Sequence, residues 1–189
     1  MTGSRAQTAD RIVNAALNLI ASDGLGSVTM RRIAETAGVA RQTLYNHYPN
    51  VDSIVVEAVD RHNRESIQLL ESTLAVVDQP ADKIEQLVRH VVAVGGHTQH
   101  APGIEHALSA EARAKLGDYD QAVERVIRQI VEEGKADGTF RRDLHRDVDV
   151  GLIRRMLGEL SEQAGHSPDG AAAIATAGAR TILASVSAR

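Results

Sequence analysis

The sequence predicts an all-α protein of about nine helices. Apolar residues recur at three- and four-residue spacing in almost every segment between glycine and proline breaks, which is the periodicity of helices with one buried face. No segment shows the alternating pattern of a β-strand. The apolar residues are mainly small aliphatics, with three tyrosines, one phenylalanine and no tryptophan. Such side chains suit closely packed helices.

Three helices are expected near the N-terminus, over residues 5–22, 30–37 and 40–47. Gly24 and Gly26 end the first helix, because glycine favours turns. Thr29 caps the second helix, since its hydroxyl can accept a backbone N–H that the first helical turn leaves unpaired. Pro49 ends the third helix, because the residue before a proline is pushed out of helical geometry.

The second and third helices are too short to be stable alone, so they need a packed partner. Two short helices that meet at Gly38 and are braced by a longer one form a helix-turn-helix. Gly38 fits the left-handed backbone position that a tight inter-helix turn often needs. A plain helix C-cap has the same geometry, so the glycine alone does not distinguish the two.

The rest of the chain is expected to form six further helices, at roughly residues 50–76, 81–94, 104–116, 118–136, 147–164 and 169–186. Asn50 or Asp52 begins the first of them, and Pro80 marks the next break. The segment "ADGTFRRDLHRDVD" is expected to be a loop.

Several classes of protein are excluded by what the sequence lacks. The absence of cysteine excludes disulfides, thiolate nucleophiles and cysteine-based zinc sites. No stretch approaches ~18 uncharged apolar residues, so no membrane span is expected. The polar N-terminus lacks the apolar core of a signal peptide. We therefore expect a cytoplasmic protein.

The third helix has a polar face of unusual composition. Arg41, Gln42, Tyr45 and Asn46 share that face, while Leu44 points to the opposite side. Guanidinium and amide groups read base edges and a phenol can bond a phosphate. We interpret Tyr45 as a surface contact to DNA, with burial in the core as the alternative.

Two flanking positions and the charge distribution bear on the same interpretation. Thr43 and His47 lie beside the polar face and can donate to phosphates, whereas Tyr48 is expected to be buried at the joint with the next helix. The net charge is −4, but residues 1–50 carry five arginines against three acidic residues. Phosphate affinity depends on such a local cationic face rather than on the total charge.

The segment "VTMRRIAETAGVARQTLYNHYPNVDSIVVEAV" resembles the DNA-binding segment of TetR/AcrR family transcriptional regulators. The matching features are the Val-Thr opening, Ile-Ala in the first short helix, Ala-Gly-Val at the turn, Thr-Leu-Tyr in the next helix and an aromatic before the long helix. The resemblance implies a helix-turn-helix DNA-binding domain at residues 1–48 and an effector-binding and dimerisation domain at residues 49–189. It also implies a homodimeric repressor that a small molecule releases from a palindromic operator of double-stranded DNA.

Carried over by position, the resemblance implies a set of DNA-binding residues. By position these are Arg31, Arg41, Gln42, Thr43, Tyr45 and His47, and the full expected set adds Asn46 of the polar face and Thr29. Two positions depart from the family pattern. Val51 stands where lysine is frequent, which removes one phosphate contact, and His47 stands where tyrosine is frequent, which makes that contact sensitive to pH.

One short recognition helix touches few base pairs, so two copies are needed on a palindrome. The last two helices are the expected dimer surface, because one has an apolar stripe and the other is rich in alanine and glycine. The expected interface residues are Val150, Ile153, Leu157, Leu160, Ile174 and Ile182. The alternative is that the stripe belongs to the core of the single chain.

An effector pocket is expected among the helices between about residues 55 and 135, with the candidates His62, His90, Val94, His97 and His100. His97 and His100 have a spacing that could hold a metal on a helix, with Glu105 or Glu111 as a further ligand. Pocket-lining histidines are the preferred interpretation, so no metal and no cofactor are predicted.

A helical enzyme or a protein-interaction bundle without DNA binding is the alternative class. The sequence has no H-E-x-x-H, G-x-S-x-G or P-loop motif, and no E-x-x-H pairs of a di-iron bundle. The prediction is therefore a ligand-responsive DNA-binding regulator and not an enzyme.

Overall fold

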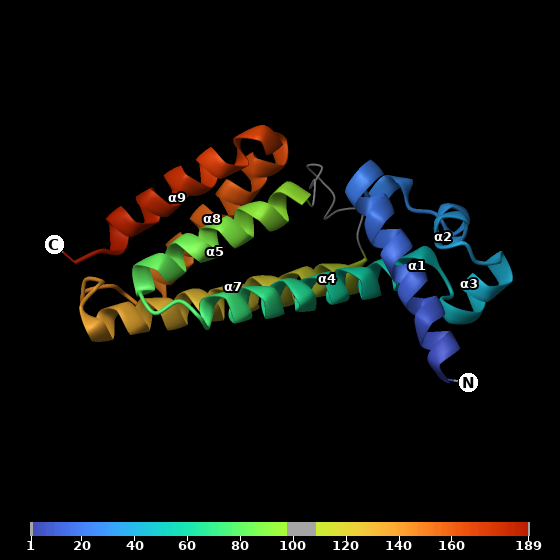
Figure 1. The fold of residues 1–189 in the computed structure, drawn as a ribbon, viewed down its shortest axis with the longest axis horizontal. Coiled ribbons are helices and arrows are strands. Elements are labelled where there is room, and N and C mark those ends of the chain that lie inside the picture. Colours follow the sequence, from blue (N-terminus) through green and yellow to red (C-terminus); the bar gives the residue numbers. More distant parts are fainter. Residues whose placement is uncertain (1, 98–108, 189) are drawn as a thin grey trace. The chain divides into compact units, whose positions relative to one another are not determined.

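A computed structural model describes residues 2–97 and 109–188, and within these residues the fold is all-α, as predicted (Figure 1). The helices are α1 (Thr2–Asp23), η1 (Leu25–Ser27), α2 (Met30–Ala37), α3 (Arg41–His47), α4 (Val51–Leu74), α5 (Pro80–His97), α7 (Ala110–Asp137), α8 (Val148–His166), η2 (Pro168–Gly170) and α9 (Ala171–Val186). No helix in the described part of the chain has both the length and the apolar character of a membrane span.

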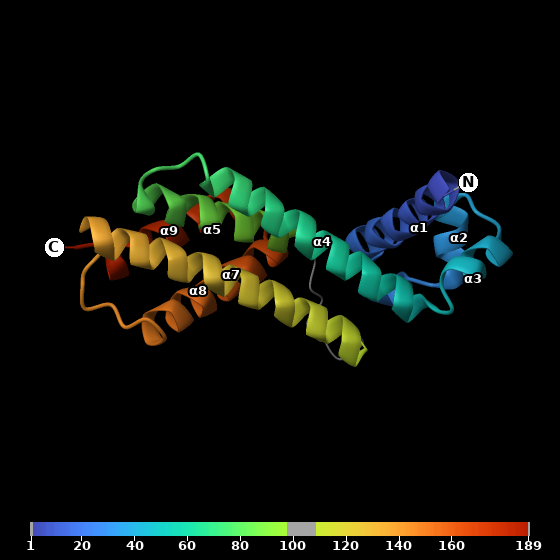
Figure 2. The same cartoon turned by 90° about the horizontal axis from the view of Figure 1, so that it is seen from below.

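The described residues form two compact units, one of residues 2–64 and 109–118 and one of residues 65–97 and 119–188. The long helices α4 and α7 (Figure 2) contribute residues to both units. The core of the first unit continues past Tyr48 and includes Ile54, Val55 and Ala58 of α4. The apolar core of the first unit therefore does not end at the predicted boundary between residues 48 and 49. The division into residues 1–48 and 49–189 stays a prediction about function.

The first unit holds α1, α2 and α3 around a small apolar core. Ile12 of α1, Ile33 of α2, Leu44 of α3 and Ile54 of α4 are fully buried in it. Packing of these buried side chains thus stabilises the two short helices α2 and α3, which could not be stable alone.

In the second unit α5 packs against α8 and α9, which also pack against each other (Figure 1). Phe140, the sole phenylalanine, is fully buried after the turn at Gly138. A Cβ atom at Gly134 would come within 2.1 Å of the Phe140 ring, so this close approach of helix and ring requires glycine. The loop predicted after α7 is confirmed.

Two details differ from the sequence-based expectations, and the start of α4, which the sequence left open between Asn50 and Asp52, is decided in favour of Asn50. α7 is one continuous helix where a break was expected near Gly117, because a glycine inside a helix costs only about 1 kcal/mol. Pro80 begins α5 rather than only preceding it, since the first helical position needs no N–H donor. Asn50 begins α4, and its side chain accepts a hydrogen bond from the Ser53 backbone N–H at 2.9 Å.

Candidate nucleic-acid interface

α2 is held by a cap at its start and an apolar face along its length. The Thr29 hydroxyl accepts a hydrogen bond from the Arg32 backbone N–H at 3.2 Å, which confirms the predicted cap. Ile33, Ala34 and Ala37 are buried against the core of the first unit. Because the cap uses the Thr29 hydroxyl as an acceptor, any contact of this side chain with a phosphate has to use its proton.

The turn between α2 and α3 depends on Gly38. Its backbone is left-handed, with φ 62° and ψ 41°, and the Gly38 and Val39 N–H groups bond the Glu35 and Ala34 carbonyls at 3.2 and 3.0 Å. This arrangement satisfies carbonyls at the helix end that have no partner inside the helix. The left-handed position predicted for Gly38 is confirmed.

Arg11 of α1 reaches the same turn, and the sequence did not single it out. Its Nη2 atom donates to the Ala37 carbonyl at 2.5 Å and to the Gly38 carbonyl at 2.9 Å. A cation at the C-terminal end of α2 is also favoured by the helix dipole. From the sequence alone Arg11 cannot be told from a solvent-exposed arginine without a partner, because the carbonyls that it contacts lie 26 and 27 residues away along the chain.

α3 turns its polar face outward. Leu44 is fully buried, whereas the Tyr45 side chain is 53 % exposed, so both predictions about orientation are confirmed. Arg41, Gln42 and Asn46 are exposed beside Tyr45. Gln42 Nε2 donates to Asn46 Oδ1 at 3.2 Å, which aligns the two amides along the face.

The remaining predicted contact residues lie around this face in different states. Thr43 and His47 are half-buried on the flank of α3. Arg31 on α2 is exposed, and its Nε lies 3.9 Å from Glu35 Oε1, too far for a firm ion pair. Its neighbour Arg32 is instead held by the Asp23 carboxylate, and hydrogen bonding from Arg32 lowers the pKa of Asp23.

Tyr48 closes the joint between α3 and α4, as predicted. It is only 7 % exposed, and its hydroxyl donates to Glu57 Oε2 of α4 at 2.8 Å. Burial, and then the hydrogen bond to Glu57, raise the pKa of Tyr48, so the phenol stays protonated as a donor.

α4 is also bonded to α1, through contacts of Arg61 that the sequence did not predict. Arg61 Nη2 lies 2.7 Å from Asp10 Oδ1, Arg61 Nη1 donates to Asn14 Oδ1 at 3.4 Å, and the Glu57 carboxylate lies 4.0 Å from Nη2. Asp10 and Asn14 are 51 and 47 residues from Arg61 in the chain, so no local pattern could link them. Through Arg61 and Tyr48, α4 is fastened to both α1 and the end of α3.

The predicted effector residues are only partly described. His62 is half-buried in the first unit, and His90 and Val94 are half-buried on α5 in the second. The His97 side chain and all of His100 and Glu105 lie outside what the structure describes. No group of three potential metal ligands occurs among the described residues.

Four of the six predicted interface residues are placed differently from the prediction. Val150, Ile153, Leu157 and Ile182 are at most 2 % exposed and lie in the core of the second unit. A partner cannot touch them without unpacking that core, which is the alternative interpretation of the stripe. Leu160 and Ile174 remain half-buried and reachable.

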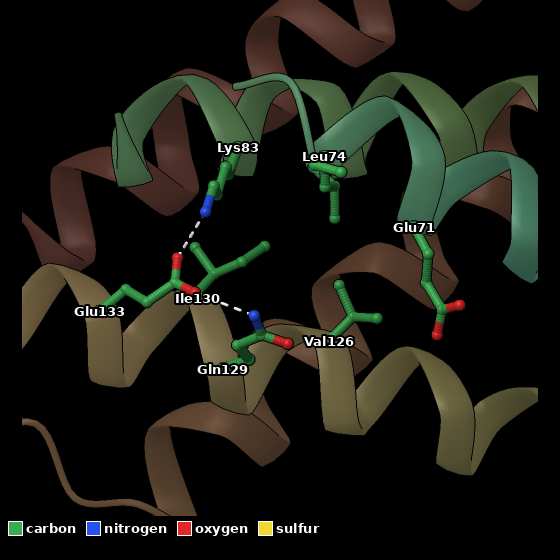
Figure 3. Close-up of a pocket in the computed structure, with 8 residues that line it drawn as sticks. Glu71, Leu74, Lys83, Val126, Gln129, Ile130 and Glu133 are labelled. Atoms are coloured by element: carbon green, nitrogen blue, oxygen red, sulfur yellow. Dashed lines mark hydrogen bonds and ion pairs between the residues drawn. The ribbon is translucent and has the colours of Figure 1, made fainter. Parts of the chain in front are cut away.

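The second unit has a groove of about 260 Å³ between the end of α4, the start of α5 and α7 (Figure 3). Leu74, Val126 and Ile130 line it together with charged side chains. Lys83 Nζ lies 2.6 Å from Glu133 Oε2, and this bond lowers the pKa of Glu133. The charges of Lys83 and Glu133, which line the groove, therefore neutralise each other.

Comparison with known proteins identifies related sequences and structures. The model of "Bacterial regulatory proteins, tetR family" matches residues 12–58, and that of "Tetracyclin repressor-like, C-terminal domain" matches residues 77–162. An uncharacterized HTH-type transcriptional regulator of Mycobacterium bovis is 34 % identical over 94 residues, which cover 50 % of this chain and 46 % of the relative. The chain thus spans about half the length of that relative.

Two further matches cover more of the chain. The HTH-type transcriptional repressor KstR2 of Mycolicibacterium smegmatis is 27 % identical over 154 residues, covering 78 % of this chain and 73 % of that protein. A Saccharomonospora viridis protein solved in complex with choline superposes with a TM-score of 0.85 at 19 % identity, and the match covers 100 % of both chains. That structural match supports the fold alone.

Proposed function

This chain belongs to the TetR family of bacterial regulatory proteins, and from that premise we propose that it is a ligand-responsive DNA-binding regulator. In this proposal it acts as a repressor that is released from a palindromic operator, since the related KstR2 is a transcriptional repressor. Such a protein works where the DNA is, so we place its action in the cytoplasm. In this proposal it performs no catalysis.

The observation that carries the proposal is the outward polar face of α3. A seven-residue helix gains little from its own hydrogen bonds, and here a single buried leucine, Leu44, fixes its rotation. That rotation leaves Arg41, Gln42, Tyr45 and Asn46 toward solvent. A face of this composition has no role in packing and suits the major groove of a duplex.

Each exposed side chain has a role in the proposal. The Arg41 guanidinium pairs with guanine or a phosphate, and the Gln42 and Asn46 amides exchange their mutual bond for bonds to adenine. The Tyr45 hydroxyl donates to a phosphate, with Thr43 donating beside it. The remaining predicted contacts, from Thr29, Arg31 and His47, extend this set along the phosphate backbone.

Specific binding in the proposal requires a homodimer, whose two recognition helices are about 34–36 Å apart on the operator. The dimer surface is best sought on the outer faces of α8 and α9. Val148 and Leu152 of α8 are 57 % and 51 % exposed, and they lie one helical turn apart. Leu160 and Ile174 extend the apolar area that a partner could cover.

Release by a small molecule is proposed to act through α4. The proposal has two conformers, one whose recognition helices match the spacing of the operator and one whose helices do not. An effector that binds the second conformer more tightly shifts the population toward it, and DNA affinity falls by the ratio of the effector's affinities for the two conformers. Tyr48–Glu57 and Arg61–Asp10 fasten α4 to the helix-turn-helix, so a shift of α4 has to move α3. This part of the proposal has support from relatives solved with ligands, such as FadR from Bacillus subtilis in complex with stearoyl-CoA.

The test is a gel shift with duplex DNA from the region around the gene for this chain, at two salt concentrations. We expect retardation that weakens as salt rises, because phosphate contacts release counterions. Arg41→Ala should weaken binding and reduce its salt dependence. Arg89→Ala is the matched control, since Arg89 is an exposed arginine of α5 whose ion pair among the described residues is local, with Glu85.

Two results would contradict the proposal. If no DNA from this region is retarded at low salt, a protein-interaction bundle or an enzyme becomes the better hypothesis. If Arg41→Ala and Arg89→Ala bind equally well, α3 is not the recognition helix.

A further inference from the structure

Three polar side chains from three helices come together inside the second unit. Ser66 of α4 is 7 % exposed, and its Oγ lies 2.9 Å from Nε2 of His90 on α5. Tyr119 of α7 packs beside the core of the same unit and lies near enough to Ser66 for that hydroxyl to influence its ionisation. Ser66 is buried, while the His90 and Tyr119 side chains beside it are half-buried.

The hydrogen bonds of this cluster are incomplete. The Tyr119 hydroxyl oxygen is buried, yet it has no hydrogen-bond partner among the described residues. The Ser66 hydroxyl nearby is bonded to His90 and makes no bond of acceptable geometry with the phenol. Buried hydroxyls in native proteins are nearly always bonded, so Tyr119 has a donor to offer to another molecule.

The surroundings define the chemistry of that molecule. Burial raises the pKa of Tyr119, an effect that Ser66 partly offsets, so the phenol is a neutral donor at physiological pH. Ile67 lies on α4 next to Ser66, and it packs with Tyr119 against the apolar core. The charged group that acts on Tyr119 is the carboxylate of Asp120, which raises the pKa of the phenol and is itself exposed to solvent, so a charged ligand would find no buried counter-ion there.

We propose that Ser66, His90 and Tyr119 form the polar anchor of the effector site, which takes a small, largely apolar and uncharged molecule with one carbonyl or hydroxyl oxygen. The inference rests on the proposed function, because it names the chemistry of the effector that the regulator would sense. Tyr119 donates to the ligand oxygen, and the Ser66–His90 pair orients the serine hydroxyl beside it. The groove at Lys83 and Glu133 is a poorer candidate, since its charged groups already bond each other.

The phenol can be removed with little effect on the free protein. Tyr119→Phe deletes a buried hydroxyl that makes no bond among the described residues, so the melting temperature should stay the same or rise. A purely structural tyrosine would behave differently, since its loss would lower the melting temperature.

The probes are cyclohexanone and methylenecyclohexane, which have the same shape but differ in the presence of the oxygen acceptor. Binding is measured on the whole chain without DNA, by the shift in melting temperature and by calorimetry. We expect saturable binding of cyclohexanone, weaker binding of the hydrocarbon, and roughly tenfold weaker cyclohexanone binding by Tyr119→Phe, the effect of one lost hydrogen bond. Ser66→Ala should also weaken binding, while Ser72→Ala, an exposed serine on the same helix, should not.

Three results would overturn the inference: no cyclohexanone binding, equal binding of both probes, or equal cyclohexanone binding by Tyr119→Phe and the unmodified protein. A marked loss of stability in Tyr119→Phe would also overturn it, since the phenol would then be structural. Failure of the proposed function gives a different pattern, because DNA retardation is absent while ketone binding is retained.

Discussion

Replacing Arg11 by alanine tests whether this side chain of α1 stabilises the turn between α2 and α3. The substitution removes the two bonds from Arg11 Nη2 to the carbonyls of Ala37 and Gly38. A protected hydrogen bond from a charged donor contributes about 1.5–3 kcal/mol. Arg11 is exposed, so solvent screening reduces the expected loss for the pair to about 1–2 kcal/mol.

The expected loss has two measurable consequences. The melting temperature should fall by about 2–8 °C, given about 2–4 °C per kcal/mol for a chain of this size. We assume that DNA binding requires an ordered turn, and that about half of the lost stability of each chain is therefore also lost from the free energy of binding. For a dimer the two halves add up to about 1–2 kcal/mol, a roughly five- to thirtyfold drop in operator affinity. Arg11→Lys should retain part of both quantities, because an ammonium group can reach one carbonyl.

The assay is fluorescence anisotropy of labelled operator at several salt concentrations, with Arg89→Ala as the control. A positioning residue changes affinity without changing the number of phosphate contacts, so the salt slope of Arg11→Ala should equal that of the unmodified protein. A slope reduced as much as in Arg41→Ala would mean that Arg11 touches DNA. An unchanged melting temperature would refute the assigned bracing of the turn.

Three further predictions concern stability. Gly38→Ala should destabilise the chain by about 1–2 kcal/mol in urea denaturation, because φ at this position is 62°; an unaffected midpoint would argue against a rigid turn. Gly134→Ala should lower the melting temperature by the equivalent of about 1–3 kcal/mol, since its new methyl overlaps the Phe140 ring, and an equally stable variant would mean that the ring moves freely. Glu133 has a lowered pKa through its bond to Lys83, so its stabilising effect is complete above the ordinary glutamate pKa and disappears as pH falls through the lowered value. Melting curves of the unmodified protein and of Glu133→Gln should therefore differ at neutral pH and converge in acid, and a constant difference would contradict the assigned bond.

The candidate interface could be predicted from the sequence because its determinants are local. Helical periodicity places Leu44 and Tyr45 on different faces of any helix over residues 40–47, whatever surrounds it. Thr29 and Gly38 act on backbone groups within a few residues of themselves, so the cap and the turn also follow from short segments. These features survive into the structure because the core of the first unit needs only one buried face from each short helix.

Contacts between distant segments were decided only by the tertiary structure. The sequence has no signal that brings Arg11 to Gly38 or Arg61 to Asp10, since an exposed arginine looks the same whether its partner is water or a residue far along the chain. Nor could the sequence resolve the apolar stripe of α8. Periodicity shows that Ile153 and Leu157 must be covered, but it does not say what covers them. In the folded chain, Ile153 and Leu157 are covered by other residues of the same core. Burial of apolar area is not directional, so any nearby apolar surface of suitable shape can cover them.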